Sequence, residues 1–212
     1  MRPPESWKTA RVTLVLTLVA AAVFLVSYPP RVHDALVDWA AFVPAEVDSG
    51  LESAGVPFWL TPLTSAFLHA NFVHIAFNLL IFVFCGRPTE AVLGPGGMVV
   101  LFLTGAYAAA AGQYLVDPNS LTPMIGASGA VSAVLGAYGL LFGRNKVKVA
   151  NPTLALWLHA LWLFAAWVIM NVIVGIVMGS AGIMIAVAAH IGGFVIGLAL
   201  ARPLLLFRYR KA

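Results

Sequence analysis

Six long apolar stretches are the feature that most constrains the fold of this chain. They cover about residues 11–28, 64–86, 97–115, 126–143, 154–178 and 183–206. A helix of roughly 17 to 25 apolar residues crosses the hydrocarbon core of a bilayer, so each stretch predicts a membrane-spanning helix. The breaks between them carry proline, glycine, serine or asparagine, which favour turns. We therefore expect an all-α membrane protein built as a six-helix bundle.

The composition excludes a water-soluble alternative. Of the 212 residues, 61% are hydrophobic and 9% are charged, whereas about 25% are charged in a typical soluble domain. Too few polar residues remain to coat a soluble surface. The single cysteine, Cys85, lies in an apolar run and allows neither a disulfide framework nor a cysteine-based zinc site. The net charge of +4 does not predict a nucleic-acid partner, because the basic residues follow the membrane topology.

The distribution of charge predicts the orientation in the membrane. With the N-terminus in the cytoplasm, every basic residue except Arg31 falls in a cytoplasmic segment, and every acidic residue except Glu5 and Glu90 falls outside. This asymmetry follows the positive-inside rule. We therefore expect a multi-pass protein with both termini cytoplasmic. Its short loops and the expectation of a single compact domain favour a prokaryotic inner membrane. The lipid bilayer is then its immediate surroundings, and the sequence leaves the oligomeric state open.

The chain is expected to form one membrane domain. We assign residues 1–10 to a short cytoplasmic N-terminus, 11–206 to the membrane domain and 207–212 to a basic cytoplasmic tail. The connection 29–63 is too polar to span, and its aromatic residues predict an outer loop along the membrane interface. Within it, residues 33–42 predict a short amphipathic helix. We favour a structural role for this loop over direct substrate contact.

Several polar side chains lie within the apolar stretches, where they are costly and therefore candidates for function. They are His69, His74, Asn78, Ser128, His159, Asn171 and His190. Ser128 and His190 are expected roughly 7 Å and roughly 10 Å inside the outer ends of their helices. No acidic residue lies centrally in a stretch, which argues against a proton relay.

Small residues predict how the fourth and sixth stretches pack. Gly193 and Gly197 follow His190 at i+3 and i+7, and such a surface lets another helix approach closely. A matching stripe on the fourth stretch is formed by Ser128, Ser132 and Gly136. Packing of the two stripes would bring Ser128 toward His190.

Ser128 and His190 together predict nucleophilic catalysis. A serine hydroxyl becomes reactive when an imidazole takes its proton, and the same imidazole later protonates the leaving amine. No acid is available for a triad, so His190 would be oriented by packing. Gly126 and Gly129 flank the serine and let a substrate backbone come close.

An oxyanion formed at this site would need hydrogen-bond donors. His74 and Asn78 are four residues apart and project from one helix face. With the backbone N–H of Ser128 they form the candidate donor set. The alternative for each is structural, since serine and asparagine often serve helix packing in membranes. Asn171 could face the site, although nothing around it assigns a role.

Three segments together resemble the rhomboid family of intramembrane serine proteases. They are residues 67–78, 126–129 and 189–193, followed by Gly197. They fall in the second, fourth and sixth stretches, as this family requires, and the similarity extends over residues 59–201. Glu90 and Gly94 also fit the family pattern.

The resemblance implies a six-helix rhomboid-like bundle that hydrolyses peptide bonds in transmembrane segments of membrane proteins, without a cofactor or metal. It implies a water-filled cavity open to the outside. By this match Ser128 is the nucleophile and His190 the general base, while His74, Asn78 and the Ser128 N–H bind the oxyanion. Substrates would carry small or helix-destabilising residues near the cleaved bond, because a helix must unwind to expose its carbonyls.

Two positions depart from the family pattern. Many members carry an aromatic residue four positions after the nucleophile, supporting the histidine ring, and this chain has Ser132. Many carry Trp-Arg before the second span, and here Trp59 is followed by Leu60. Both changes bear on catalytic efficiency, because neither removes a group needed for bond making.

Three other functions remain as alternatives. A non-catalytic rhomboid-like protein would bind and escort transmembrane helices, but would not need to keep Ser128 and His190. A transporter or channel is disfavoured because we find neither an internal repeat nor buried acids. A metal site is disfavoured because His69 and His74 stand five positions apart, a poor spacing for two ligands on one helix. His33 and His159 are expected near the membrane interfaces as snorkelling or solvated groups.

Overall fold

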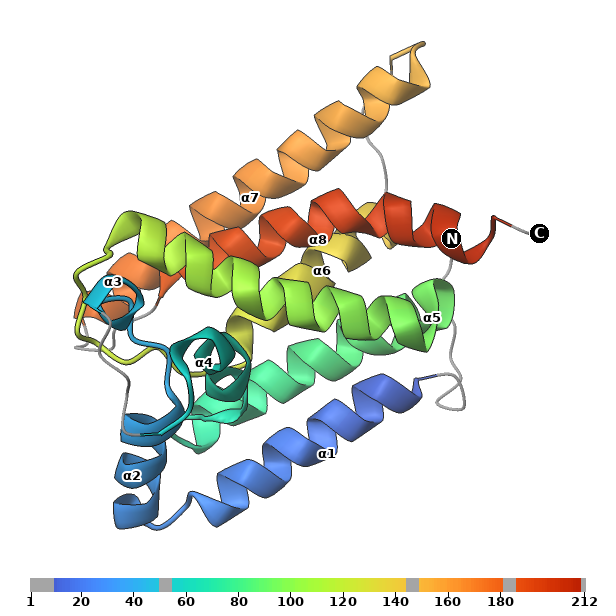
Figure 1. Ribbon diagram of the computed structural model, residues 1–212. Coiled ribbons are helices and arrows are strands. Elements are labelled where there is room, and N and C mark those ends of the chain that lie inside the picture. Colours follow the sequence, from blue (N-terminus) through green and yellow to red (C-terminus); the bar gives the residue numbers. More distant parts are fainter. Residues whose placement is uncertain (1–9, 50–54, 144–148, 181–185, 211–212) are drawn as a thin grey trace.

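The computed structural model describes residues 10–49, 55–143, 149–180 and 186–210, and it is helical (Figure 1). The long helices are α1 (Arg11–Val26), α5 (Phe72–Val116), α6 (Ser128–Phe142), α7 (Pro152–Ser180) and α8 (Val187–Arg208). The shorter elements are α2 (Pro30–Ala40), α3 (Glu46–Ser49), α4 (Thr61–Thr64) and the 3-10 helices η2 (Phe58–Leu60) and η3 (Ser65–Phe67). The predicted all-α class is confirmed for this part of the chain.

Helix α5 is bent at Gly94 into two arms. Gly94 has φ 80° and ψ 168°, a backbone conformation that glycine adopts without steric cost. Pro95 can begin the second arm, since proline suits the first position of a helix. We call residues 72–93 the first arm and residues 95–116 the second arm. They run in opposite directions (Figure 1), and the break is shorter than the connection expected between residues 86 and 97.

Within the described ranges, three helices are long and apolar enough to cross a membrane: α5, α7 and α8. Helices α1 and α6 are also apolar but shorter. Because α5 consists of two arms, the described residues contain six apolar helical segments in the expected order. Their ends differ from the expected stretches by several residues at most sites.

The second expected stretch, 64–86, was wrong at its start. Residues 65–67 form η3, and α5 begins only at Phe72. The cause is Asn71, whose Oδ1 accepts a hydrogen bond from the N–H of His74 at 2.9 Å. An asparagine in this position caps a helix and starts it at the following residue. His69 therefore lies outside the helix that carries His74.

Helices α6 and α8 touch through their backbones. A Cβ added to Gly193 would collide with the carbonyl oxygen of Gly129, and one added to Gly197 would collide with that of Ala133. A Cβ on Gly136 would lie 2.6 Å from the Phe194 carbonyl oxygen. The expected stripe of Gly193 and Gly197 is therefore at the contact. On α6 the backbone contact uses Gly129 and Ala133, one position along from the expected serines.

The second arm of α5 completes this closely packed core. A Cβ on Gly112 would lie 2.6 Å from the Ala188 carbonyl oxygen of α8, and one on Gly105 would lie 2.6 Å from the Ala133 Cβ of α6. Small residues thus let three helices approach until dispersion contacts are made by the backbones themselves. This three-helix core fixes where the ends of α6 and α8 lie.

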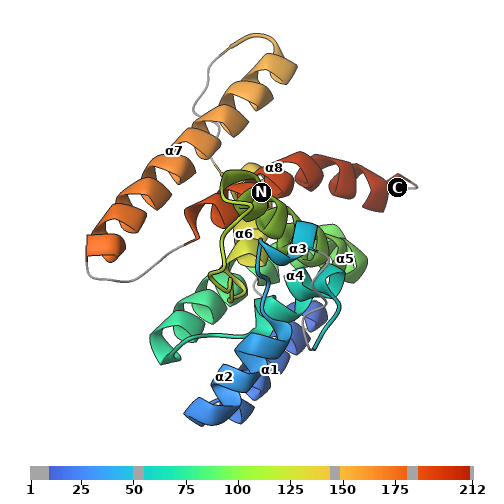
Figure 2. The same cartoon turned by 60° about the vertical axis from the view of Figure 1, so that its left-hand side comes forward.

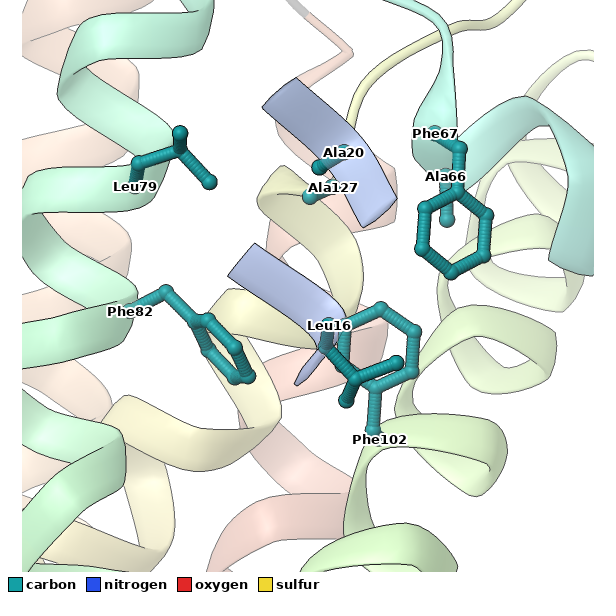
Figure 3. Close-up of a pocket in the computed structure, with 8 residues that line it drawn as sticks. All are labelled: Leu16, Ala20, Ala66, Phe67, Leu79, Phe82, Phe102 and Ala127. Atoms are coloured by element: carbon teal, nitrogen blue, oxygen red, sulfur yellow. The ribbon is translucent and has the colours of Figure 1, made fainter. Parts of the chain in front are cut away.

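A small apolar pocket lies beside the core, between α1, both arms of α5, η3 and the start of α6 (Figure 3). Its lining residues are Leu16, Ala20, Ala66, Phe67, Leu79, Phe82, Phe102 and Ala127. Their side chains are all hydrocarbon and offer a ligand no hydrogen bond. We regard the pocket as part of the packing of α1 on the bundle.

Glu90 joins α1 to the first arm of α5. Its side chain is fully buried. One carboxylate oxygen accepts from the N–H of Val12 at 2.9 Å, and the other accepts from the N–H and the hydroxyl of Thr13, both at 2.7 Å. These are among the first amides of α1, which have no partner within the helix and lie at its positive end.

Glu90 corrects the expectation that no acid is buried. The first arm extends beyond residue 86, so Glu90 lies inside a helix instead of just past one. This removes one argument against a transporter. The carboxylate is nevertheless occupied by three donors from α1, as expected of a buried charge that serves structure.

The C-terminal end of α8 meets the bend in α5. The Arg208 Nη1 donates to the carbonyls of Ala91 at 3.0 Å and Glu90 at 3.3 Å. The start of α1, the bend at Gly94 and the end of α8 therefore lie at one end of the bundle (Figure 1). Helix α8 also extends past 206, so the expected tail from 207 begins within the helix.

The outer connection contains the helix that its sequence predicts, but shifted. It is α2, which begins three residues before the expected 33–42 segment and ends two residues before that segment does. Trp39, Phe58 and Trp59 are exposed, as aromatic residues at a membrane interface would be. Phe42 is instead buried, and its backbone pairs with that of Met124 in an isolated bridge.

Helix α7 stands apart from the other long helices (Figure 2). Three of its 29 residues are buried, namely Ala155, His159 and Asn171. His159 was expected to be solvated, but it is 5% exposed and its Nε2 has no hydrogen-bond partner. The helix thus meets the bundle at a few defined points.

We predict that Glu90→Ala destabilises the protein. The change leaves the donors of Val12 and Thr13 buried without an acceptor, and each such donor costs about 1–3 kcal/mol. The thermal unfolding midpoint in detergent should therefore fall clearly. Thr104→Ala is the control, because the Thr104 hydroxyl bonds to carbonyls of its own helix. An unchanged midpoint for Glu90→Ala would contradict the role of this carboxylate.

We also predict that Gly193→Ala costs about 1–3 kcal/mol of stability, because the new methyl group overpacks the α6–α8 contact. Gly96→Ala is the matched control, since a Cβ there would meet nothing within 4 Å. It should be neutral or slightly stabilising because alanine favours a helix. The midpoints of both variants are compared in one detergent, and equal midpoints would argue against backbone contact at Gly193.

Candidate active site

The loop before α6 is held by the outer connection, through Phe42, and by η3, through Ser65. The N–H of Met124 donates to the Phe42 carbonyl at 2.8 Å, and the N–H of Gly126 donates to the Ser65 carbonyl at 2.9 Å. These bonds fix the chain immediately before Ser128. They support the structural role that the sequence favours for the outer connection.

His69 also supports this loop. Its side chain is 1% exposed. Its Nε2 accepts from the N–H of Ala127 at 3.4 Å, and its Nδ1 lies 3.3 Å from the Phe67 carbonyl oxygen. The rings of His69 and His74 meet edge to face, with centroids 5.1 Å apart. A regular helix would have turned His69 away, but residues 68–71 are not helical.

Neither nitrogen of His69 is therefore open toward a metal ion. Within the ranges that the structure describes, no group of three or more His, Cys, Asp or Glu side chains could hold one. The arrangement of His69 and His74 is that of two packed rings, one of which holds a backbone amide.

Ser128 is the first residue of α6 and is half-buried. The sequence placed it about five residues inside the helix, and that position was wrong. The N–H groups of a first helical turn have no carbonyl partner in their own helix, and the helix dipole makes this end positive. An oxyanion beside Ser128 would therefore meet free donors.

Gly126 brings Ser128 and His74 close together. Its φ of +116° favours glycine. A Cβ at this position would lie 2.7 Å from Cε1 and Nε2 of His74 and 3.8 Å from the Ser128 Oγ. The imidazole and the hydroxyl thus both border the space that a side chain at Gly126 would fill.

Asn78 lies one turn further along α5 and is buried. Its Nδ2 donates to the His74 carbonyl at 3.0 Å. One of its two amide hydrogens is thus engaged within the helix, and the other is available. Ser132 is also buried, and its hydroxyl donates to the Ser128 carbonyl at 2.7 Å.

His190 is half-buried and is the fourth residue of α8, not the seventh residue of a longer span. It precedes Gly193 by about one turn, and Ser128 directly precedes Gly129. Because the backbones touch at Gly193 and Gly129, the two candidate residues lie at the same end of this contact. Among the described residues, no hydrogen bond joins the Ser128 hydroxyl to the His190 ring.

Asn171 of α7 is the residue that the sequence did not assign. Its Oδ1 lies 2.8 Å from the Nδ1 of His190, and its Nδ2 donates to the Trp167 carbonyl at 3.0 Å. The one sequence signal for a role of Asn171 was its amide in an otherwise apolar stretch. No spacing rule relates positions in that stretch to positions in α8, so the sequence could not identify His190 as its partner.

The described residues thus gather a serine at a helix N-terminus, a histidine with an acceptor at one ring nitrogen, and a second histidine beside the serine. This combination suits acyl transfer, in which an imidazole activates a hydroxyl and nearby donors stabilise an oxyanion.

The comparison with known families agrees with this chemistry. The family model for the rhomboid domain matches residues 58–207. The chain therefore belongs to the rhomboid family, as its three motifs indicated, and is a multi-pass integral membrane protein.

Several bacterial rhomboid proteases are similar to this chain. Rhomboid protease GlpG of Pectobacterium atrosepticum is 30% identical over 201 residues, which cover 92% of this chain and 63% of the relative. GlpG of Serratia proteamaculans is 33% identical over 149 residues, 66% of this chain and 46% of the relative. GluP of Bacillus subtilis is 29% identical over 139 residues, 66% of this chain and 25% of the relative. The chain thus spans less than two thirds of the length of these relatives.

Proposed function

We propose that this protein is an intramembrane serine endopeptidase that cleaves transmembrane segments of membrane proteins. The observation that carries the proposal is the position of Ser128 at the N-terminus of α6, where α6 touches the helix that carries His190. The names of the curated relatives, which are rhomboid proteases, support the same activity.

In the proposed mechanism the Ser128 Oγ attacks the carbonyl carbon of the scissile bond, and His190 takes the hydroxyl proton. The tetrahedral intermediate collapses, the C–N bond breaks, and His190 gives its proton to the leaving amine. A water molecule then attacks the acyl-enzyme with His190 again as the base, which releases the acid product and restores the serine.

The negative charge of each intermediate is bound by the N–H of Ser128 and by donors of His74 and Asn78. The free amides of the first turn of α6 suit this task, because they are fixed before the reaction begins. We expect the Ser128 hydroxyl and the His190 imidazole to form their hydrogen bond on substrate binding, because catalytic hydrogen bonds often reach good geometry only in the substrate complex. Gly126 lets the chain pass close to the His74 ring, whereas Gly129 is buried against Ala109 and Gly193, so the expectation that Gly129 makes room for substrate was wrong.

The substrate must enter as an extended segment. In a transmembrane helix each carbonyl is engaged in an i to i−4 hydrogen bond, so the helix has to unwind before attack. Small or helix-destabilising residues near the scissile bond lower the cost of that step. We therefore expect cleavage sites in segments of this composition.

We further propose six membrane crossings in a prokaryotic inner membrane, with both termini cytoplasmic. Six apolar helical segments and the charge asymmetry support this topology. In this topology the end of the bundle where α1 begins and α8 ends, with Arg11 and Arg208, is cytoplasmic. Helix α6 would then run from the outer side at Ser128 to the cytoplasmic side at Phe142. The site would then open toward the outer side.

Ser128→Ala is expected to abolish labelling by a fluorophosphonate probe, and His190→Ala to reduce it strongly, because the probe reports an activated serine. Labelling is measured on purified protein in detergent and again in lipid. Ser27→Ala, in a serine at the C-terminal end of α1, is the control and should label as the wild type does. A wild-type protein that does not label in lipid would favour the non-catalytic, helix-binding alternative.

His74→Ala and Asn78→Ala are each expected to lower turnover of a transmembrane substrate by about 10- to 1000-fold, as expected for loss of an oxyanion donor. Turnover is measured in vesicles, with the folded state checked by the thermal midpoint. His33→Ala in α2 is the matched control. Full turnover in the double variant would leave both residues a packing role only.

A further inference from the structure

We propose that Asn171 is a positioning residue for His190, which holds the imidazole in the tautomer that can act as a base. This inference rests on the proposed function, in which His190 takes a proton from Ser128. It assigns a role to the contact between α7 and α8. That role follows from two hydrogen bonds made by one buried amide.

The two bonds settle which way the amide of Asn171 points. Its Nδ2 donates to the Trp167 carbonyl at 3.0 Å, and a carbonyl oxygen can only accept. The Oδ1 therefore faces His190, where it lies 2.8 Å from Nδ1. With the amide turned the other way, an oxygen would face the Trp167 carbonyl and lose that bond.

The orientation of the amide fixes the proton on the imidazole. An amide oxygen accepts, so the Nδ1 of His190 must be the protonated nitrogen that donates to it. In the neutral ring this leaves Nε2 without a proton. Nε2 is then the atom that can accept the hydroxyl proton of Ser128, and the imidazolium formed keeps the bond to Asn171.

The surroundings of Asn171 make it a firm support. The side chain is 5% exposed, although most of α7 is not buried. One turn earlier, Trp167 stacks on Phe194 with ring centroids 5.1 Å apart and planes 15° from parallel. The Trp167 Nε1 also donates to the His190 carbonyl at 3.4 Å. This segment of α7 is thus docked on α8 beside the ring.

Asn171 also supplies the support for the His190 ring that Ser132 does not give. Where an aromatic residue would support the histidine ring, this chain has a serine whose hydroxyl is engaged with the Ser128 carbonyl. Support from α7 can replace support from α6, because either fixes the plane of the ring. The oxygen of Asn171 does more than an aromatic contact, since it also selects the tautomer.

Two variants of Asn171 separate the acceptor from the packing. Asn171→Leu keeps a similar volume but has no oxygen. Asn171→Asp keeps an oxygen toward Nδ1, and in its protonated form it also keeps a donor toward the Trp167 carbonyl. Trp167→Phe is the control for docking, because it removes the indole N–H but keeps an aromatic ring to stack on Phe194.

The rate of fluorophosphonate labelling in lipid is the first measurement. We expect Asn171→Leu to slow labelling by about 10- to 100-fold, a part of what general base catalysis supplies. Asn171→Asp and Trp167→Phe should label at rates close to that of the wild type. Labelling of Asn171→Leu at the wild-type rate would overturn the inference. So would an equal loss in Trp167→Phe, which would trace the effect to docking.

A second measurement does not depend on activity. With ¹⁵N-labelled histidine, the ring signals of His190, assigned by their loss in His190→Ala, report which nitrogen is protonated. We expect the Nδ1–H tautomer in the wild type and a mixture of tautomers in Asn171→Leu. A wild-type ring protonated at Nε2 would overturn the role of Asn171. Absence of labelling in the wild type would instead reject the proposed protease function, so the two failures are distinguishable.

Discussion

The backbone contact between α6 and α8 is the constraint on which the site depends. Gly129 and Ala133 of α6 present carbonyl oxygens where Gly193 and Gly197 of α8 have no side chain. In a bilayer no hydrophobic force drives helices together, so such close approach supplies the attraction through dispersion contacts. It also sets the register of the two helices. The positions of Ser128 and His190 at the same end of the contact follow from that register.

The two ends of the bundle differ in how the backbone N–H and carbonyl groups of their helix ends are paired. At one end the carboxylate of Glu90 binds the amides of Val12 and Thr13 in the first turn of α1, and Arg208 binds two carbonyls in the last turn before the bend in α5. The two charged side chains thus pair with backbone N–H and carbonyl groups near helix ends, where such groups often have no partner within the helix. At the other end the first amides of α6 are left without a partner in their own helix. That difference separates the end that stabilises the fold from the end that can bind an anionic intermediate.

The sequence predicted the class of fold, the order of the apolar segments and the residues that gather near Ser128, because apolar length and small-residue spacing act locally. It misplaced the start of α5, since one asparagine cap at Asn71 overrode a continuous apolar run. It also missed that Glu90 is buried and that Asn171 meets His190. Both depend on contacts between distant segments, and no periodicity within one segment can report them.

An amide beside His190 is the physically reasonable choice for a base within a membrane. A carboxylate in that place would stabilise the imidazolium more strongly, but a buried charge is costly unless several donors surround it. Glu90 has three such donors, whereas the position of Asn171 offers one ring nitrogen and faces a backbone carbonyl. A neutral acceptor selects the same tautomer without that cost. The resting site then carries no fixed charge on the base or its support, and charge develops only where the amides of α6 can receive it.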